Sequence, residues 1–365
     1  MPSQINSPAG VFVTPNGEVF FCDRGNQRVR KILRTGETVT IAGTGKRGYN
    51  GDDQPATQAQ LYEPSSVFVS SRNEVYISEA IGQRIRKIQS NGNIVTVVGT
   101  GIGGYNGDGI PATEAMIQYP YGIFVTEQDE LYFADYCNSR IRKVFNGIIT
   151  TVAGTGIDGY NGDGLLAKNT DLQCPICVSI SETNEMYIVE HNRVRKVNSN
   201  GIVSTIAGTG VNGCNTSGVL ATNARLNDPW FVTVVNGEVY IAEYVNNRIR
   251  KILRNGIIVT IAGTDDGYNV DGILATSVQL SSPNCVFVTN NGEIYISEYK
   301  GCRIRKINSH GIISTIAGYS GVGIPGYSGD VPFDFRKYPH IGARTKPIKP
   351  FPKSYLDVSI QCQME

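Results

Sequence analysis

Histidine, tryptophan and charged side chains are scarce in this chain. Its 365 residues include three His and one Trp, and charged residues make up 18%. With so few histidines, a Ser-His-Asp arrangement cannot be argued from sequence order. The formal net charge is +1. This balance disfavours a general polyanion binder, because such proteins carry a basic excess. Of the binding functions, RNA binding is therefore the least favoured.

Long apolar runs are also absent. No stretch of about 18 apolar residues occurs, so the sequence predicts no membrane insertion. The first six residues have neither the basic nor the apolar segment of a signal peptide. The eight cysteines do not follow the internal periodicity of the chain, and isolated thiols suit a reducing compartment. These absences favour an intracellular location without establishing one.

Glycine, in contrast, is abundant at 42 residues, and the sequence repeats itself. A Pro, an Arg and a Gly each recur six times with a period of about 55 residues, which is typical of a repeat architecture. The six arginines are Arg28, Arg84, Arg140, Arg193, Arg248 and Arg303. The repeats predict units at residues 6–43, 64–99, 120–154, 175–208, 229–263 and 283–318.

Each unit contains four short strand patterns. In the first unit they cover residues 11–14, 18–23, 28–33 and 38–42. Asn16 and Gly17 supply the tight turn between the first two strands. Four antiparallel strands repeated radially form a propeller blade, whereas a solenoid normally uses shorter repeats. The predicted fold over residues 1–318 is therefore an all-β, six-bladed β-propeller, expected to be a monomeric ring.

Residues 319–365 interrupt the periodicity. Prolines interleaved with Lys and Arg predict an extended C-terminal tail without a packed core. Within this tail, residues 355–360 alternate in polarity like a strand. The last and first units share no strand, so we expect this segment either to clasp the ring along an edge strand or to be a disordered remnant.

An acid ends the second strand of every unit, and the repeated Arg opens the third. In the fourth unit the loop between them is two residues shorter, yet acid and Arg remain opposite each other, as an ion pair requires. We therefore predict six structural ion pairs: Asp23–Arg28, Glu79–Arg84, Asp135–Arg140, Glu190–Arg193, Glu243–Arg248 and Glu298–Arg303.

The segment at residues 131–141 reads LYFADYCNSRI. This pattern resembles the NHL-repeat family. The long insert at residues 99–113 resembles the variety seen in bacterial proteins and in teneurins. The resemblance implies a recognition module for protein, RNA or carbohydrate. The histidine of the family's Asn-His-Arg-Ile core is missing from every unit, where Gln, Ser, Asn or Cys302 stands instead.

The links between units are long. At about 20 residues they exceed the usual 4–6, and long ordered loops on a rigid scaffold often carry binding sites. These links and the turns between the second and third strands emerge at one end of the blades, which we call the link face. A Tyr-Asn-Gly-Asp element recurs there, and its candidate ligand-binding residues are Tyr105, Asn106, Asp108, Tyr160, Asn161 and Asp163. Turn scaffolding is the favoured role of this element, and calcium is a weaker alternative because each copy has few carboxylates.

The fourth and fifth units depart most from the repeat. Ser179 and Thr233 replace a Phe of the first strand, Trp230 occurs only in the fifth unit, and the fourth unit shortens its loop around His191. A specific ligand requires broken symmetry, and exposed aromatic residues dominate binding hot spots. We therefore expect a recognition patch on the link face over these units, anchored by Tyr121 and Trp230. Sequence drift with repacking of the core is the alternative.

We interpret the chain as a non-enzymatic binding scaffold whose ligand is a protein or a carbohydrate. A metal-dependent hydrolase or lyase of the lactonase type is the alternative. It is less favoured because the inner strands show mainly Val and Phe. Cys174 and Cys177 have zinc spacing, but zinc requires four ligands and no second pair exists. No metal site or other cofactor is therefore predicted.

Overall fold

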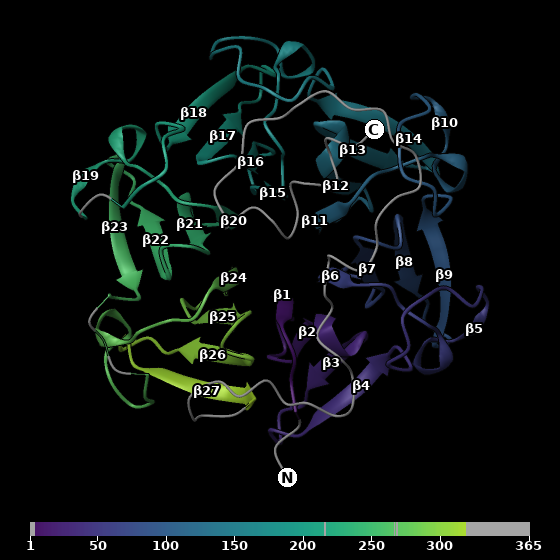
Figure 1. Ribbon diagram of the computed structural model, residues 1–365, viewed down its shortest axis with the longest axis horizontal. Coiled ribbons are helices and arrows are strands. Elements are labelled where there is room, and N and C mark those ends of the chain that lie inside the picture. Colours follow the sequence, from purple (N-terminus) through teal and green to yellow (C-terminus); the bar gives the residue numbers. More distant parts are fainter. Residues whose placement is uncertain (1–3, 215–216, 266, 268, 319–365) are drawn as a thin grey trace, which may run out of the picture. The chain divides into compact units, whose positions relative to one another are not determined.

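The structure is a computed structural model that describes residues 4–214, 217–265, 267 and 269–318. The tail predicted over residues 319–365, including the strand expected at 355–360, lies outside the described residues. Six antiparallel sheets are arranged in a ring around a central axis, which we call the channel axis or, in short, the channel (Figure 1). The prediction of an all-β, six-bladed propeller is confirmed.

The blades follow one another in sequence order. Blade 1 comprises β1 (Pro8–Val13), β2 (Val19–Asp23), β3 (Arg28–Ile32) and β4 (Thr38–Ala42). Blade 2 comprises β6 (Pro64–Val69), β7 (Val75–Glu79), β8 (Arg84–Ile88) and β9 (Asn93–Val98). Blade 3 comprises β11 (Pro120–Val125), β12 (Leu131–Asp135), β13 (Arg140–Phe145) and β14 (Ile148–Ala153).

The second half of the ring has the same order. Blade 4 comprises β15 (Cys177–Ile180), β16 (Met186–Glu190), β17 (Arg193–Val197) and β18 (Val203–Ala207). Blade 5 comprises β20 (Pro229–Val235), β21 (Glu238–Glu243), β22 (Arg248–Ile252) and β23 (Ile257–Ala262). Blade 6 comprises β24 (Pro283–Val288), β25 (Ile294–Glu298), β26 (Arg303–Ile307) and β27 (Ile313–Gly318). The first strand of each blade lies nearest the channel, and the last strand lies at the rim (Figure 1).

Short 3-10 turns occur in the loops. Two of them, η1 (Arg24–Asn26) and η4 (Tyr136–Asn138), lie between the second and third strands of their blades. The others lie in the links: η2 (Ala56–Gln58), η3 (Ala112–Glu114), η5 (Ala167–Asn169), η6 (Ala221–Asn223) and η7 (Ala275–Ser277). Among the described residues, no helix is long and apolar enough to cross a bilayer.

The core lies between neighbouring blades, and the alternation of side chains along each strand fills it. Consecutive residues of a strand point to opposite faces, so Phe20 belongs to one buried cluster with Val67 of blade 2, whereas Phe21 belongs to another with Cys285 of blade 6. Inner strands approach each other closely. A Cβ added at Gly122 would lie 2.8 Å from the Cα of Cys177, so this position requires glycine.

Three links add a fifth strand to the outer edge of the next blade, which the sequence did not predict. The added strands are β5 (Gln54–Pro55) on β9, β10 (Ile110–Pro111) on β14 and β19 (Val219–Leu220) on β23. In blades 4 and 6, single bridges join Leu166 to Ile202 and Leu274 to Ile312. Two-residue strands are too short to produce a periodic pattern, so only the tertiary structure reveals them.

Blade 6 meets blade 1 by direct packing of inner strands. Ile5, Val11 and Phe21 belong to one buried cluster with Cys285 and Ile304. The Val11 N–H donates to the Cys285 Sγ at 3.3 Å. In the part of the chain that the structure describes, β1 and β24 belong to separate sheets, so apolar packing rather than a shared strand joins these two blades.

Candidate binding site

The buried charges around the ring keep the predicted register but not the predicted partners. Asp135 lies opposite Arg140 across β12 and β13, as expected. The ion pair, however, forms between the Asp135 carboxylate and Arg142, at 3.2 Å, and both side chains are fully buried. The arginine two positions after the repeated one, on the same strand, pairs with the acid in every blade: Arg30, Arg86, Arg142, Arg195, Arg250 and Arg305.

The predicted pairing is therefore corrected at five sites, which are Asp23–Arg28, Glu79–Arg84, Asp135–Arg140, Glu190–Arg193 and Glu243–Arg248. In blade 6, Glu298 contacts both Arg303, at 2.7 Å, and Arg305, at 3.2 Å. The repeated arginine that opens the third strand instead points toward the links that flank its blade. Arg140 donates to the carbonyl of Thr155 at 2.9 Å, and its guanidinium lies 3.9 Å from the centre of the Tyr105 ring. Strand register sets which residues face each other, but it does not set where a long side chain ends.

Where it occurs, the Tyr-Asn-Gly-Asp element joins its link to the next blade. We call residues 105–108 and their equivalents the link clip. The Tyr105 ring covers the guanidinium of Arg142, with 4.8 Å between them. The Asp108 carboxylate accepts hydrogen bonds from Arg142, at 3.0 Å, and from the Thr151 hydroxyl, at 3.0 Å. Asp108 thereby ties the link to both β13 and β14.

The asparagine of the clip holds the loop itself. The Asn106 side chain donates to the carbonyl of Glu114 at 3.0 Å and accepts from the Met116 N–H at 2.8 Å. Asn161 makes the same two contacts, and Tyr160 and Asp163 contact Arg195 in the same way. The six link residues named as ligand-binding candidates thus make contacts within the chain, as their favoured role of turn scaffolding requires. Among the described residues, no group of three or more His, Cys, Asp or Glu is arranged to hold a metal ion.

Tyr121 and Trp230 do come together, in a cluster in which Tyr121 is buried and Trp230 is half-buried. Their rings meet edge to face with centroids 6.0 Å apart. Tyr136, Tyr244 and Tyr299 extend the contact, and we call these five residues the aromatic cluster. Tyr121 is only 4% exposed, so it does not present the surface that a hot-spot anchor requires. The cavity beside Tyr121 and Trp230 measures about 20 Å³, which is room for a single water.

The remaining predicted residue of this face, His191, lies half-buried in the turn between β16 and β17. The backbone N–H of His191 donates to the backbone carbonyl of Gln173 at 3.0 Å. Burial lowers the pKa of His191, and the neighbouring Arg193 lowers it further. The burial of Tyr121 removes one of the two aromatic anchors of the recognition patch expected over blades 4 and 5. Trp230, the anchor in blade 5, is half-buried, so the patch itself stays a prediction.

A pH titration tests the environment of the aromatic cluster. Burial raises the pKa of Asp228 to about 6, and Trp230 lies two residues further along the chain. Because Trp230 is the only tryptophan, its emission should change with a midpoint near pH 6. The folded state favours protonated Asp228, so its contribution to stability is present at low pH and is lost as the pH rises through about 6. Asp228→Asn should abolish the transition, and a transition that persists in this variant would refute the assignment.

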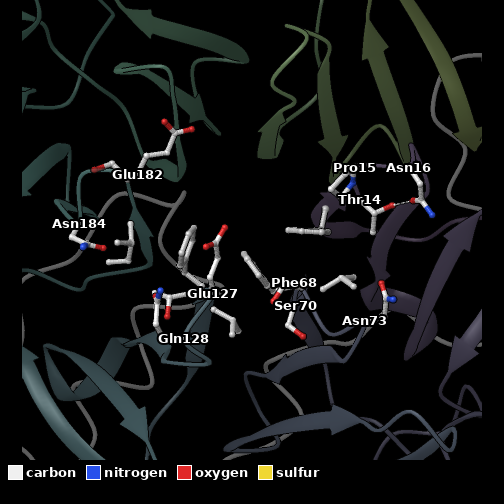
Figure 2. Close-up of a pocket in the computed structure, with 18 residues that line it drawn as sticks. Thr14, Pro15, Asn16, Phe68, Ser70, Asn73, Glu127, Gln128, Glu182 and Asn184 are labelled. Carbon is white, nitrogen blue, oxygen red and sulfur yellow. Dashed lines mark hydrogen bonds between the residues drawn. The ribbon is translucent and has the colours of Figure 1, made fainter.

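A large pocket opens at the other end of the channel, at the turns between the first and second strands, which we call the hairpin face (Figure 2). Its volume is about 880 Å³. Phe12, Phe68 and Phe124 line it, with ring centroids 4.6 and 5.1 Å apart in successive pairs. The polar lining comes from blades 1 to 4: Thr14, Asn16, Ser70, Ser71, Asn73, Thr126, Glu127, Gln128, Ser181, Glu182 and Asn184.

Sequence reasoning missed this pocket, although one signal was available. Phe12, Phe68, Phe124 and Phe287 occupy the same position of the first strand in four units, whereas Ser179 and Thr233 stand there in blades 4 and 5. The four Phe rings form an arc in which Phe12 contacts both Phe68 and Phe287. The broken symmetry noticed in the sequence therefore also shapes the wall of the channel.

The ring of antiparallel blades with a pocket at its channel mouth defines this protein as a six-bladed β-propeller. The chain contains an NHL repeat, as its sequence pattern predicts. The family model described as NHL repeat matches residues 226–252, which lie in blade 5. Two curated relatives are teneurin-1 of Mus musculus and teneurin-4 of Homo sapiens, each 26% identical, over 84% and 77% of this chain. The chain spans only 12% and 11% of the length of these relatives.

Solved structures share the fold. A Bacteroides thetaiotaomicron protein of unknown function superposes with a TM-score of 0.61 and 18% identity, covering 83% of this chain and 70% of that chain. Virginiamycin B lyase from Staphylococcus aureus superposes with a TM-score of 0.51 and 16% identity, covering 86% and 87%. At these identities the likeness shows the propeller architecture alone.

Proposed function

We propose that this propeller is a recognition module that binds a protein partner in the pocket of the hairpin face. The observation that carries the proposal is the chemistry of the pocket. It has an apolar floor of phenylalanine rings beneath a polar rim, and its volume of about 880 Å³ lies in the range of ligand sites. Apolar pockets surrounded by polar groups are where partner side chains anchor most strongly.

The rim charge specifies the kind of side chain that fits. The residues that line the pocket include two acids, Glu127 and Glu182, and none that is basic. A Lys or Arg of the partner would lay its aliphatic stem along the rings of Phe68 and Phe124 and direct its charge to these carboxylates. We therefore propose a basic protein segment as the ligand, and a neutral carbohydrate is the competing outcome.

A photo-crosslinking residue tests where the partner binds. Placed at the exposed Gln128 on the pocket rim, it should form an adduct with a protein from cells that express this chain. The same residue at Ile102, which is 62% exposed on the link face, should form none with that protein. An adduct formed only from position 102 would contradict the proposed site.

Charge reversal at the rim tests the proposed chemistry. With the identified partner, Glu127→Arg combined with Glu182→Arg should raise Kd at least tenfold, or about 1.4 kcal/mol. The wild-type affinity should fall with added salt, because exposed charges are screened. Glu114→Arg, an exposed reversal in η3 at the link face, serves as the matched control and should leave Kd unchanged. The proposal would be overturned by a ligand, such as a neutral glycan, that binds the wild type and the rim-reversal variant with the same affinity.

A further inference from the structure

Blade 1 keeps the two residues that hold a link clip in other blades. In blades 2, 3, 4 and 6, the clip aspartate bonds to the buried arginine of the third strand and to a threonine of the fourth. In blade 4, for example, Asp163 bonds to Arg195 at 2.9 Å and to the Thr205 hydroxyl at 3.0 Å. Arg30 and Thr40 face each other across β3 and β4 in the same register.

These two residues of blade 1 have no clip in the part of the chain that the structure describes. Each link there follows one of blades 1 to 5 and bonds to the next blade. Arg30 bonds to Asp23 at 3.1 Å and to the Thr40 hydroxyl at 2.8 Å. Its side chain is 17% exposed, whereas the equivalent arginines of the other five blades are 0% exposed. Arg30 therefore has accessible surface that a second carboxylate can reach.

The arginines of blade 1 also lack an aromatic cover among the described residues. In blade 3, the centre of the Tyr105 ring lies 3.9 Å from the guanidinium of Arg140 and 4.8 Å from that of Arg142. Tyr49 and Tyr160 cover the equivalent arginines of blades 2 and 4. A segment with a Tyr three residues before an Asp would supply both kinds of contact to blade 1.

The sequence after blade 6 contains such a segment. Residues 326–330 read Gly-Tyr-Ser-Gly-Asp, and residues 104–108 read Gly-Tyr-Asn-Gly-Asp. Asp330 follows Gly318, the last residue of β27, by 12 positions, and Asp108 follows the equivalent Gly99 by nine. Nine residues reach the next blade elsewhere in the ring, so twelve are sufficient. The blade that follows blade 6 around the ring is blade 1 (Figure 1).

A second difference in blade 1 matches a difference in this segment. In blade 2 the link continues past its aspartate into η2, where Ala56 belongs to a buried cluster with Ile94 of β9. An alanine begins this turn in all five links, but residues 331–333 read Val-Pro-Phe. Thr38 stands in blade 1 at the position of Ile94. A polar Thr38 does not require the apolar cover that the turn provides elsewhere, so a clip without the turn suits this blade.

We propose that residues 327–330 are the link clip of blade 1. The Asp330 carboxylate accepts hydrogen bonds from Arg30 and Thr40, and the Tyr327 ring covers the guanidinium of Arg28. The clip adds a polar attachment between the last and first blades to the apolar packing that joins them. This inference concerns the closure of the ring and does not depend on the pocket of the hairpin face.

A photo-crosslinking residue in the full chain locates the segment. Placed at position 327, it should form an intramolecular adduct with the peptide that contains β3, as mass spectrometry of a digest would show. The same residue at position 105 is the positive control and should form an adduct with the peptide that contains β13, because Tyr105 lies against Arg140 and Arg142. At Tyr338, another tyrosine of the tail, it should form none with β3. Adducts from position 327 only with other blades, or only with a second copy of the chain, would overturn the proposal.

Thermal unfolding tests the contacts of Asp330. Asp330→Asn should lower the Tm by about 2 °C, the shift typical of one such interaction in a large domain. Asp334→Asn makes the same change nearby in the tail and should leave the Tm unchanged. In an Arg30→Met background Asp330→Asn should have no effect, and in the milder Thr40→Val background its effect should shrink, because residues in contact are not additive. The proposal fails if Asp330→Asn lowers the Tm equally in all three backgrounds or does not lower it in the wild type.

Discussion

Arg142→Met is expected to lower the free energy of unfolding by about 3–5 kcal/mol, because it removes the cation from a buried ion pair. Arg142 and Asp135 are both fully buried and lie 3.2 Å apart. Burial already raises the pKa of Asp135 to about 6, and the arginine opposes that shift. Without Arg142 the Asp135 carboxylate stays buried without its cation, and Asp108 keeps its bond to Thr151 of β14 but loses its bond to β13.

Urea-induced unfolding at pH 7.5 measures this loss. Arg72→Met is the matched control, because Arg72 is 70% exposed while it pairs with Asp129, and such surface pairs contribute less than about 1 kcal/mol. In the Arg142→Met background, Asp135→Asn should restore part of the stability, since it removes the unpaired charge. Equal effects of the Arg142 and Arg72 substitutions would show that the buried network is not a determinant of stability.

Phe21→Ala should lower the free energy of unfolding by about 3–5 kcal/mol, as expected for a large buried aromatic residue. Phe21 is fully buried, in the cluster that joins blade 6 to blade 1. Its loss leaves a cavity in the cluster that includes Val11 and Cys285, where no shared strand holds the two blades together in the described part of the chain. The packing between blades 6 and 1 should therefore be weakened.

Two further variants give the Phe21 result its meaning. Phe133→Ala removes an equally buried ring between blades 2 and 3 and should cost a similar amount. Phe145→Ala removes a ring that is 43% exposed and should cost less than about 1 kcal/mol. If Phe21→Ala lowers the free energy of unfolding as little as Phe145→Ala does, the packing described above does not hold blades 6 and 1 together.

The binding site was less predictable than the fold, for a geometric reason. The pocket on the hairpin face is assembled from four hairpins that are about 55 residues apart in sequence, and each contributes only a Phe and a few polar residues that look ordinary alone. The sequence did mark Tyr121 and Trp230 as a pair, and the structure brings their rings to 6.0 Å. It could not show that Tyr121 would be buried, because burial depends on the strands that surround it.

The periodic positions of Pro, Arg and Gly, with strand-length segments between them, determined the six blades and their cross-strand register. A repeated local pattern is sufficient for this, because each blade forms from contiguous strands. Only the tertiary structure decided that Arg142 rather than Arg140 meets Asp135, and that the link aspartates clip onto the following blade. These outcomes depend on where long side chains and long links end in space, and contacts between distant segments decide that.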